Sequence, residues 1–107
     1  MFTKYDILSI LIKAKDIYCE EPLALGMCVC IRAATYKLYK EWLLDYQDIR
    51  KIIPEFNFEF LNTYVRNING YWWTISNRQA RIDAFDKLIN HYKQLIENEE
   101  NNIKVFD

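Results

Sequence analysis

The residues best suited to chemistry in this sequence are three consecutive aromatics, Tyr71, Trp72 and Trp73, followed by Arg78 and Arg81. In one interpretation, the arginines bind the phosphate of a small anionic, nucleotide-type ligand while an aromatic ring stacks on its base. In a second, these side chains form an exposed patch that docks on another protein, since tryptophan, tyrosine and arginine dominate interface energetics. Both interpretations predict a binding site at these five residues.

The place of the two arginines at a helix start favours an anion nearby. Ser76 or Asn77 can cap the helix, which puts Arg78 in its first turn and Arg81 just after it, with no acid before Asp83. Cations are unfavourable there because the N-terminus of a helix carries partial positive charge. We therefore expect a negatively charged group opposite the arginines.

A structural interpretation of the same corner remains open. In it, Trp72 and Trp73 close the hydrophobic core, and the two arginines pair with Glu55 or Glu59. The function would then lie elsewhere on the surface.

The sequence contains no pattern typical of catalysis or metal binding. Nucleophilic catalysis needs a base beside the nucleophile, and the single histidine, His91, stands in the middle of a predicted helix. Phosphate-binding loops and dinucleotide folds need glycines that this chain, with only two, does not have. On a helix Cys28 and Cys30 point about 200° apart, so we interpret them, and Cys19, as buried structural thiols. We expect no enzyme activity, no cofactor and no metal.

Composition favours one soluble helical domain over residues 1–107. Of the 107 residues, 51% are hydrophobic and 16% aromatic, while Gly and Pro number two each, which argues against disorder and against a turn-rich β-fold. The formal charge of −1 gives no broad positive surface for duplex nucleic acid. There is no charged leader and no apolar run of the roughly 18–20 residues that span a membrane, so we expect a cytoplasmic protein.

The spacing of apolar residues predicts a compact all-α bundle of four to five helices. The first covers 4–20, with Thr3 as its N-cap and Asp6 three residues later. The second, over 23–38, is apolar on nearly every side, so we expect it to be the most buried helix. Its one early charge, Arg32, is either paired in the interior or directed into a pocket, and pairing is favoured because arginine is seldom buried without a partner.

The next two helices are predicted over 40–52, ending before Pro54, and over 55–65. Strict alternation in residues 55–60 is typical of a strand. A lone strand of six residues would have no partner, however, and the apolar spacing continues in a helical pattern. We therefore favour a short helix.

The last helix has the clearest periodicity, with apolar residues every three or four positions from Ile82 to Ile96. The polar tail, about 97–107, is expected to fray. The short apolar run at 103–106 either docks on the domain or reaches a second copy. This tail, the exposed aromatics and the small net charge favour a homodimer.

Several short motifs carry a resemblance that covers most of the chain: Gly-Met-Cys at 26–28, Ile-Pro-Glu-Phe at 53–56, Gly-Tyr-Trp-Trp at 70–73, Arg-Ile at 81–82 and Phe-Asp-Lys-Leu-Ile at 85–89. In this combination the chain resembles small proteins encoded by bacteriophages and prophages. The resemblance implies an accessory protein in the host bacterial cytoplasm, such as a counter-defence or host-takeover inhibitor that binds a host or defence-system protein. It implies no particular activity.

Overall fold

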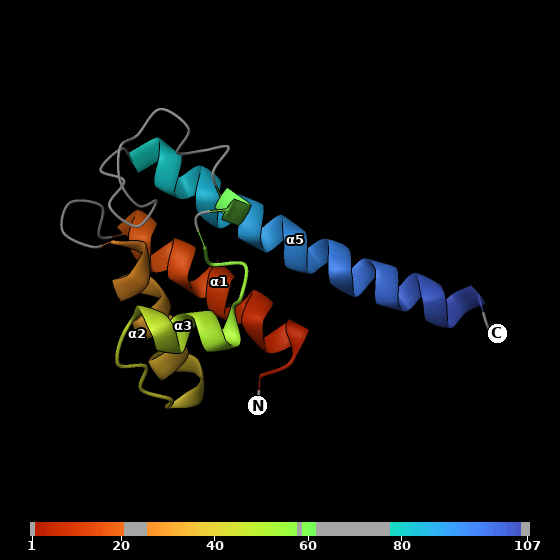
Figure 1. Cartoon of the computed structure of the whole chain (residues 1–107), viewed down its shortest axis with the longest axis horizontal. Helices are drawn as coiled ribbons and strands as arrows, with labels where there is room; N and C mark the ends of the chain where they lie inside the picture. Colours follow the sequence, from red (N-terminus) through yellow and green to blue (C-terminus); the bar gives the residue numbers. More distant parts are fainter. Residues whose placement is uncertain (1, 21–25, 58, 62–77, 106–107) are drawn as a thin grey trace.

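The regular secondary structure of this protein is helical. The structure, a computed structural model, describes residues 2–20, 26–57, 59–61 and 78–105, and these contain no strand. The helices in these residues are α1 (Lys4–Glu20), α2 (Met27–Tyr39), α3 (Tyr46–Ile52) and α5 (Arg78–Val105) (Figure 1). The predicted all-α bundle is confirmed.

Helix α1 begins at the predicted position. The Thr3 hydroxyl accepts a hydrogen bond from the Asp6 amide at 3.1 Å, and the Asp6 carboxylate accepts one from the Thr3 amide at 2.9 Å. This reciprocal capping satisfies N–H groups that the start of a helix leaves without partners. The Tyr39 hydroxyl also donates to Asp6, at 3.0 Å, and so fastens the end of α2 to the start of α1.

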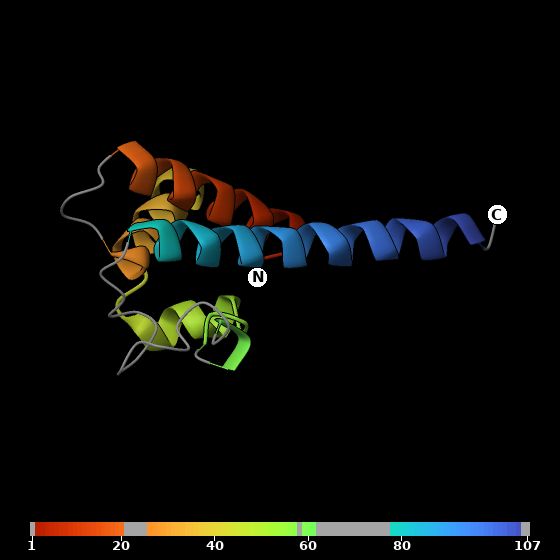
Figure 2. The ribbon, with the colours of Figure 1, turned by 90° about the horizontal axis from the view of Figure 1, so that it is seen from above.

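Helices α1 and α5 pack side by side and run in opposite directions (Figures 1 and 2). Lys4 pairs with Glu99 at 3.2 Å, and further along α1 Lys15 pairs with Asp86 at 2.5 Å, which fixes this antiparallel register. The two apolar faces meet in the core, which contains Ile7, Ile10, Leu11, Ala14, Ile17 and Tyr18 from α1 and Ala84, Phe85, Leu88, Ile89 and Tyr92 from α5.

Helix α2 is less enclosed than its composition predicts. It begins at Met27 rather than at residue 23, with Gly26 as its N-cap, and residues 21–25 lie outside the described part of the chain. One face, which includes Ile31 and Ala34, is buried against the core. The opposite face is open, because no described element covers the side of α2 that carries Val29 and Tyr36, 45% and 44% exposed.

The predicted helix over 40–52 is confirmed only in its second part, Tyr46–Ile52. Lys40 adopts the left-handed conformation, with φ 61°, and ends α2. Asp45 then caps α3 by accepting a hydrogen bond from the Asp48 amide at 3.1 Å. Because both ends are capped, residues 40–44 form a loop between two helices.

The segment after α3 turns and then begins a helix, without forming a strand in its described residues. The Asn57 side chain accepts a hydrogen bond from the Phe60 amide at 2.8 Å, and the Asn57 carbonyl accepts one from the Leu61 amide at 3.2 Å. Residues 59–61 are accordingly helical. The rest of the helix predicted over 55–65 is a turn up to Asn57, and beyond Leu61 it lies outside the described residues.

Helix α5 projects beyond the rest of the bundle (Figures 1 and 2). Its 28 residues span about 42 Å, whereas the 17 residues of α1 span about 26 Å, so the end of α5 passes the start of α1. The helix continues to Val105, through most of the tail for which we expected fraying. None of the described helices is long and apolar enough to cross a membrane.

Candidate functional site: an aromatic pocket on helix α2

The predicted aromatic and arginine corner is described only in part. Tyr71, Trp72 and Trp73 lie outside the described residues. Arg78 and Arg81 both lie against Tyr18, with their guanidinium carbons 5.4 Å and 5.8 Å from the centre of its ring. Tyr18 is only 1% exposed, so the start of α5 covers the end of α1 here.

The antiparallel packing supplies a negative group opposite Arg78. An Nη of Arg78 donates to the main-chain carbonyl of Cys19 at 3.5 Å. Because Cys19 belongs to the last turn of α1, its carbonyl lies at the partially negative end of that helix dipole. A position unfavourable for the dipole of α5 is therefore favourable for that of α1, and this contact gives Arg78 a structural role.

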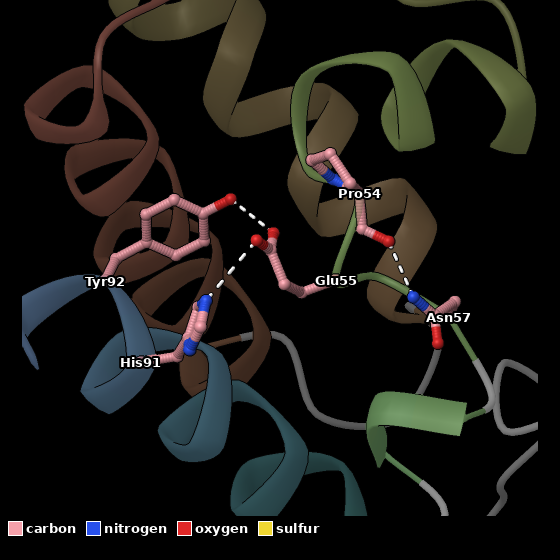
Figure 3. A network of polar contacts seen from close by, with 5 residues as sticks. All are labelled: Pro54, Glu55, Asn57, His91 and Tyr92. Atoms are coloured by element: carbon pink, nitrogen blue, oxygen red, sulfur yellow. Dashed lines mark hydrogen bonds and ion pairs between the residues drawn. The ribbon is translucent and has the colours of Figure 1, made fainter. Parts of the chain in front are cut away.

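Glu55, one of the two acids considered as an arginine partner, contacts α5 at other residues. Its carboxylate accepts a hydrogen bond from the Tyr92 hydroxyl at 2.5 Å and lies 3.3 Å from Nε2 of His91 (Figure 3). Burial, and then the hydrogen bond to Glu55, raise the pKa of Tyr92 well above its ordinary value. These contacts fasten the turn after α3 to the middle of α5, and within that turn Nδ2 of Asn57 donates to the Pro54 carbonyl at 2.6 Å.

The thiols differ in their surroundings. Cys30 is fully buried and Cys28 is partly buried, and burial raises the pKa of both. Cys19 is exposed, so the expectation of a buried thiol was wrong at this position, where the last turn of α1 faces solvent. The described residues contain no cluster of three or more histidine, cysteine or acidic side chains that could hold a metal.

A second group of aromatic and cationic side chains, not identified from the sequence, lies on the exposed face of α2. Trp42, in the loop after α2, is 61% exposed, and its ring meets that of Tyr36 edge to face at 5.4 Å. The guanidinium carbon of Arg32 lies 5.6 Å from the centre of the Trp42 ring. These residues border an open cavity of about 320 Å³, here called the Trp42 pocket, which is lined by Val29, Arg32, Ala33, Tyr36, Lys37 and Trp42.

Helix α2 and the loop after it hold the pocket in shape. Val29, Arg32, Ala33 and Tyr36 follow i, i+3, i+4, i+7 spacing, which places them on one face of the helix. Nε of Arg32 donates to the Leu43 carbonyl at 2.8 Å, and Leu43 is itself nearly buried. Arg32 thus fastens the loop to α2 next to Trp42.

Arg32 combines the two alternatives that its sequence context left open. It is partly buried and paired, as favoured, but its partner is a main-chain carbonyl and its side chain also borders a surface pocket. The feature of the sequence that could have indicated the pocket was the charge of Arg32 within an otherwise apolar face of α2. The pocket was missed because Trp42 was assigned to a continuous helix over 40–52.

Known proteins add nothing to this description of the surface. Comparison of the chain with protein-family models, with curated proteins and with solved structures finds no match. Function must therefore be argued from the geometry and charge of the Trp42 pocket.

Proposed function

We propose that this protein is a non-enzymatic binding protein that docks on another protein through the Trp42 pocket. The observation that carries the proposal is that a tryptophan is 61% exposed and yet held in place by Arg32. Exposed apolar patches with a polar rim are typical of interaction sites. A ring fixed before binding loses little conformational entropy when a partner covers it.

The residue types around the pocket support docking on a protein. Tryptophan, tyrosine and arginine are the side chains most enriched among those that dominate interface energies. Leu44, 69% exposed in the same loop as Trp42, adds apolar surface.

The resemblance to phage and prophage proteins gives the proposal its context. We take the partner to be a host or defence-system protein in the bacterial cytoplasm, and the protein to be an inhibitor that acts by covering a surface of that partner. A homodimer is part of this proposal, since the projecting end of α5 offers helical surface beyond the bundle (Figure 2).

Affinity capture with a matched control tests the proposal. Tagged wild type, Trp42→Ala and Tyr5→Ala are each used to capture proteins from a bacterial lysate. Tyr5 is a suitable control because it is 53% exposed and lines a different pocket with Lys4 and Glu99. A stoichiometric partner retained by wild type and Tyr5→Ala but lost with Trp42→Ala supports the proposal. Equal recovery by all three variants contradicts it.

A second candidate function is binding of a small anionic, nucleotide-type ligand in the same pocket. Its volume of about 320 Å³ is at the lower end of the range of small-molecule sites, and two aromatic rings and two cations line it. In a Trp72→Phe/Trp73→Phe variant, Trp42 is the only tryptophan left. Saturable quenching of its fluorescence by AMP or ATP, reduced by Lys37→Gln, favours this candidate, and unchanged fluorescence excludes it.

A further inference from the structure

Lys40 holds a conformation that its residue type disfavours. It is the one non-glycine residue with positive φ among the described residues, at φ 61° and ψ 23°, and its amide donates to the Tyr36 carbonyl at 2.8 Å. Helices that end this way usually place glycine here, because a Cβ is disfavoured in the left-handed region. Strain of this kind points towards a function for the side chain.

The side chain of Lys40 lies against a residue of the Trp42 pocket, although Lys40 does not itself line the cavity. Its Nζ lies 5.4 Å from the centre of the Tyr36 ring, and Tyr36 forms one wall of the pocket. Lys37, one turn earlier on α2, lines the same pocket and forms no ion pair with any described residue. The guanidinium of Arg32 lies over the Trp42 ring. Two cations therefore line the apolar cavity, and Lys40 adds a third beside Tyr36.

The acid next to Lys40 faces a different cavity, and Asp45 and Asp48 are used in hydrogen bonds at the start of α3. Glu41 follows Lys40 directly, but it lines a separate pocket of about 470 Å³ together with Asp6 and Tyr39. None of the carboxylates in the described residues lines the Trp42 pocket. Since the whole chain has a formal charge of −1, the positive character of the Trp42 pocket is local. Charge complementarity of this kind selects partners at interfaces.

We propose that the Trp42 pocket binds an acidic segment of the partner protein. An apolar side chain of that segment enters the cavity and packs against Tyr36, Trp42 and Val29, and neighbouring carboxylates bind the ammonium groups of Lys37 and Lys40. This inference rests on the proposed docking function and adds the chemistry of the partner. Lys40 is then a specificity-determining residue, kept at a helix end where glycine would fit better.

Three blocked tripeptides test the inference on the intact protein. Acetylated and amidated Asp-Phe-Asp, Asn-Phe-Asn and Lys-Phe-Lys share an aromatic anchor and differ in charge. They are titrated into ¹⁵N-labelled protein, and the amide signals of Val29 and Tyr36 and the indole signal of Trp42 are followed. We expect the acidic peptide to bind about three- to tenfold more tightly than the neutral one, with the difference shrinking in salt, and the basic peptide to bind most weakly.

Lysine variants separate the contribution of charge to peptide binding from that of apolar packing. Lys37→Gln/Lys40→Gln is expected to abolish the preference for the acidic peptide and to leave neutral-peptide binding unchanged. The matched control Lys13→Gln/Lys93→Gln removes two lysines on α1 and α5 and should retain the full preference. Lys40→Gly is the sharpest variant, because it should reduce the preference while raising the unfolding midpoint.

Four results overturn the inference. They are equal affinities for the three peptides, signal changes confined to residues outside the Trp42 pocket, tighter binding of AMP than of the acidic peptide, and concentration-dependent shifts of the pocket signals without peptide. The last result would place a second copy of this chain on the pocket. If capture still depends on Trp42 while the peptides show no charge preference, the docking function stands and only the acidic chemistry of the partner fails.

Discussion

The guanidinium of Arg32 stacks on the exposed ring of Trp42, 5.6 Å from its centre, while its Nε binds the carbonyl of the next residue, Leu43. One side chain thus holds both the ring and the main chain of the loop. Charge-assisted hydrogen bonds and cation–π contacts of this kind fix a side chain that solvent would otherwise leave mobile.

Removal of this contact should release the loop. In a Trp72→Phe/Trp73→Phe background, we expect Arg32→Gln to lower the fluorescence anisotropy of Trp42 and to reduce the free energy of unfolding by about 1 kcal/mol. Time-resolved anisotropy and urea denaturation measure the two effects. An anisotropy unchanged by the substitution would show that the ring is held by other contacts.

Lys40→Gly should stabilise the protein. Glycine adopts φ 61° without the steric cost of a Cβ, so we expect a gain of up to about 1 kcal/mol in the free energy of unfolding. Lys37→Gly is the matched control, because the same change within α2 should cost about 1 kcal/mol. Urea denaturation compares both with wild type, and a loss of stability in Lys40→Gly would rule out strain at this helix end.

The Asp6 carboxylate should stabilise the folded protein near neutral pH but not at strongly acid pH. The hydrogen bond from the Thr3 amide, helped by the Tyr39 hydroxyl, lowers the pKa of this carboxyl below 3.8. The unfolded chain therefore binds the proton first as the pH falls. The contribution of Asp6 to the free energy of unfolding is complete well above pH 3.8. It is lost as the pH falls through the lower pKa that Asp6 has in the folded protein.

The comparison for Asp6 uses Asp6→Asn, which removes the titrating group. Urea midpoints of wild type and this variant are measured between about pH 2 and pH 6. We expect the advantage of wild type to shrink towards the acid end of this range. A difference that is constant with pH would mean that the capping carboxylate does not titrate with folding.

The three thiols should react in an order set by exposure. Near pH 8 a disulfide reagent should modify Cys19 first, Cys28 more slowly and Cys30 only when the protein unfolds. Burial raises the pKa of Cys30 from 9.0 to about 11, so stability should also fall as the pH rises between these values. A fast phase that persists in Cys19→Ser would contradict this order.

The start of α1 and the periodic face of α5 could be predicted from the sequence because their signals are local. Thr3 and Asp6 have the spacing of a reciprocal cap, and the apolar residues of α5 repeat every three or four positions. The end of α2 could not be predicted in this way. Lys40 carries none of the preference for left-handed backbone that glycine or asparagine would have shown.

The candidate site could not be predicted from the sequence because it depends on tertiary contacts. The Trp42 pocket exists only because the loop after α2 folds back and binds Arg32, a contact between residues eleven positions apart. The group that Arg78 contacts is likewise a main-chain carbonyl of another helix. A search of the sequence for acidic residues cannot identify such a partner. The sequence predicted a surface of the same kind, aromatic with cations, at 71–81, and of the five residues proposed there the structure describes Arg78 and Arg81.

The most direct test of the docking proposal is the affinity of the captured partner for purified variants. By calorimetric titration we expect Trp42→Ala to weaken binding by at least about 2 kcal/mol, roughly thirtyfold in Kd, and Tyr5→Ala to stay within about 0.5 kcal/mol of wild type. Circular dichroism and urea midpoints must show that both variants are folded. Equal affinities of wild type and folded Trp42→Ala would contradict the role of the Trp42 pocket in binding.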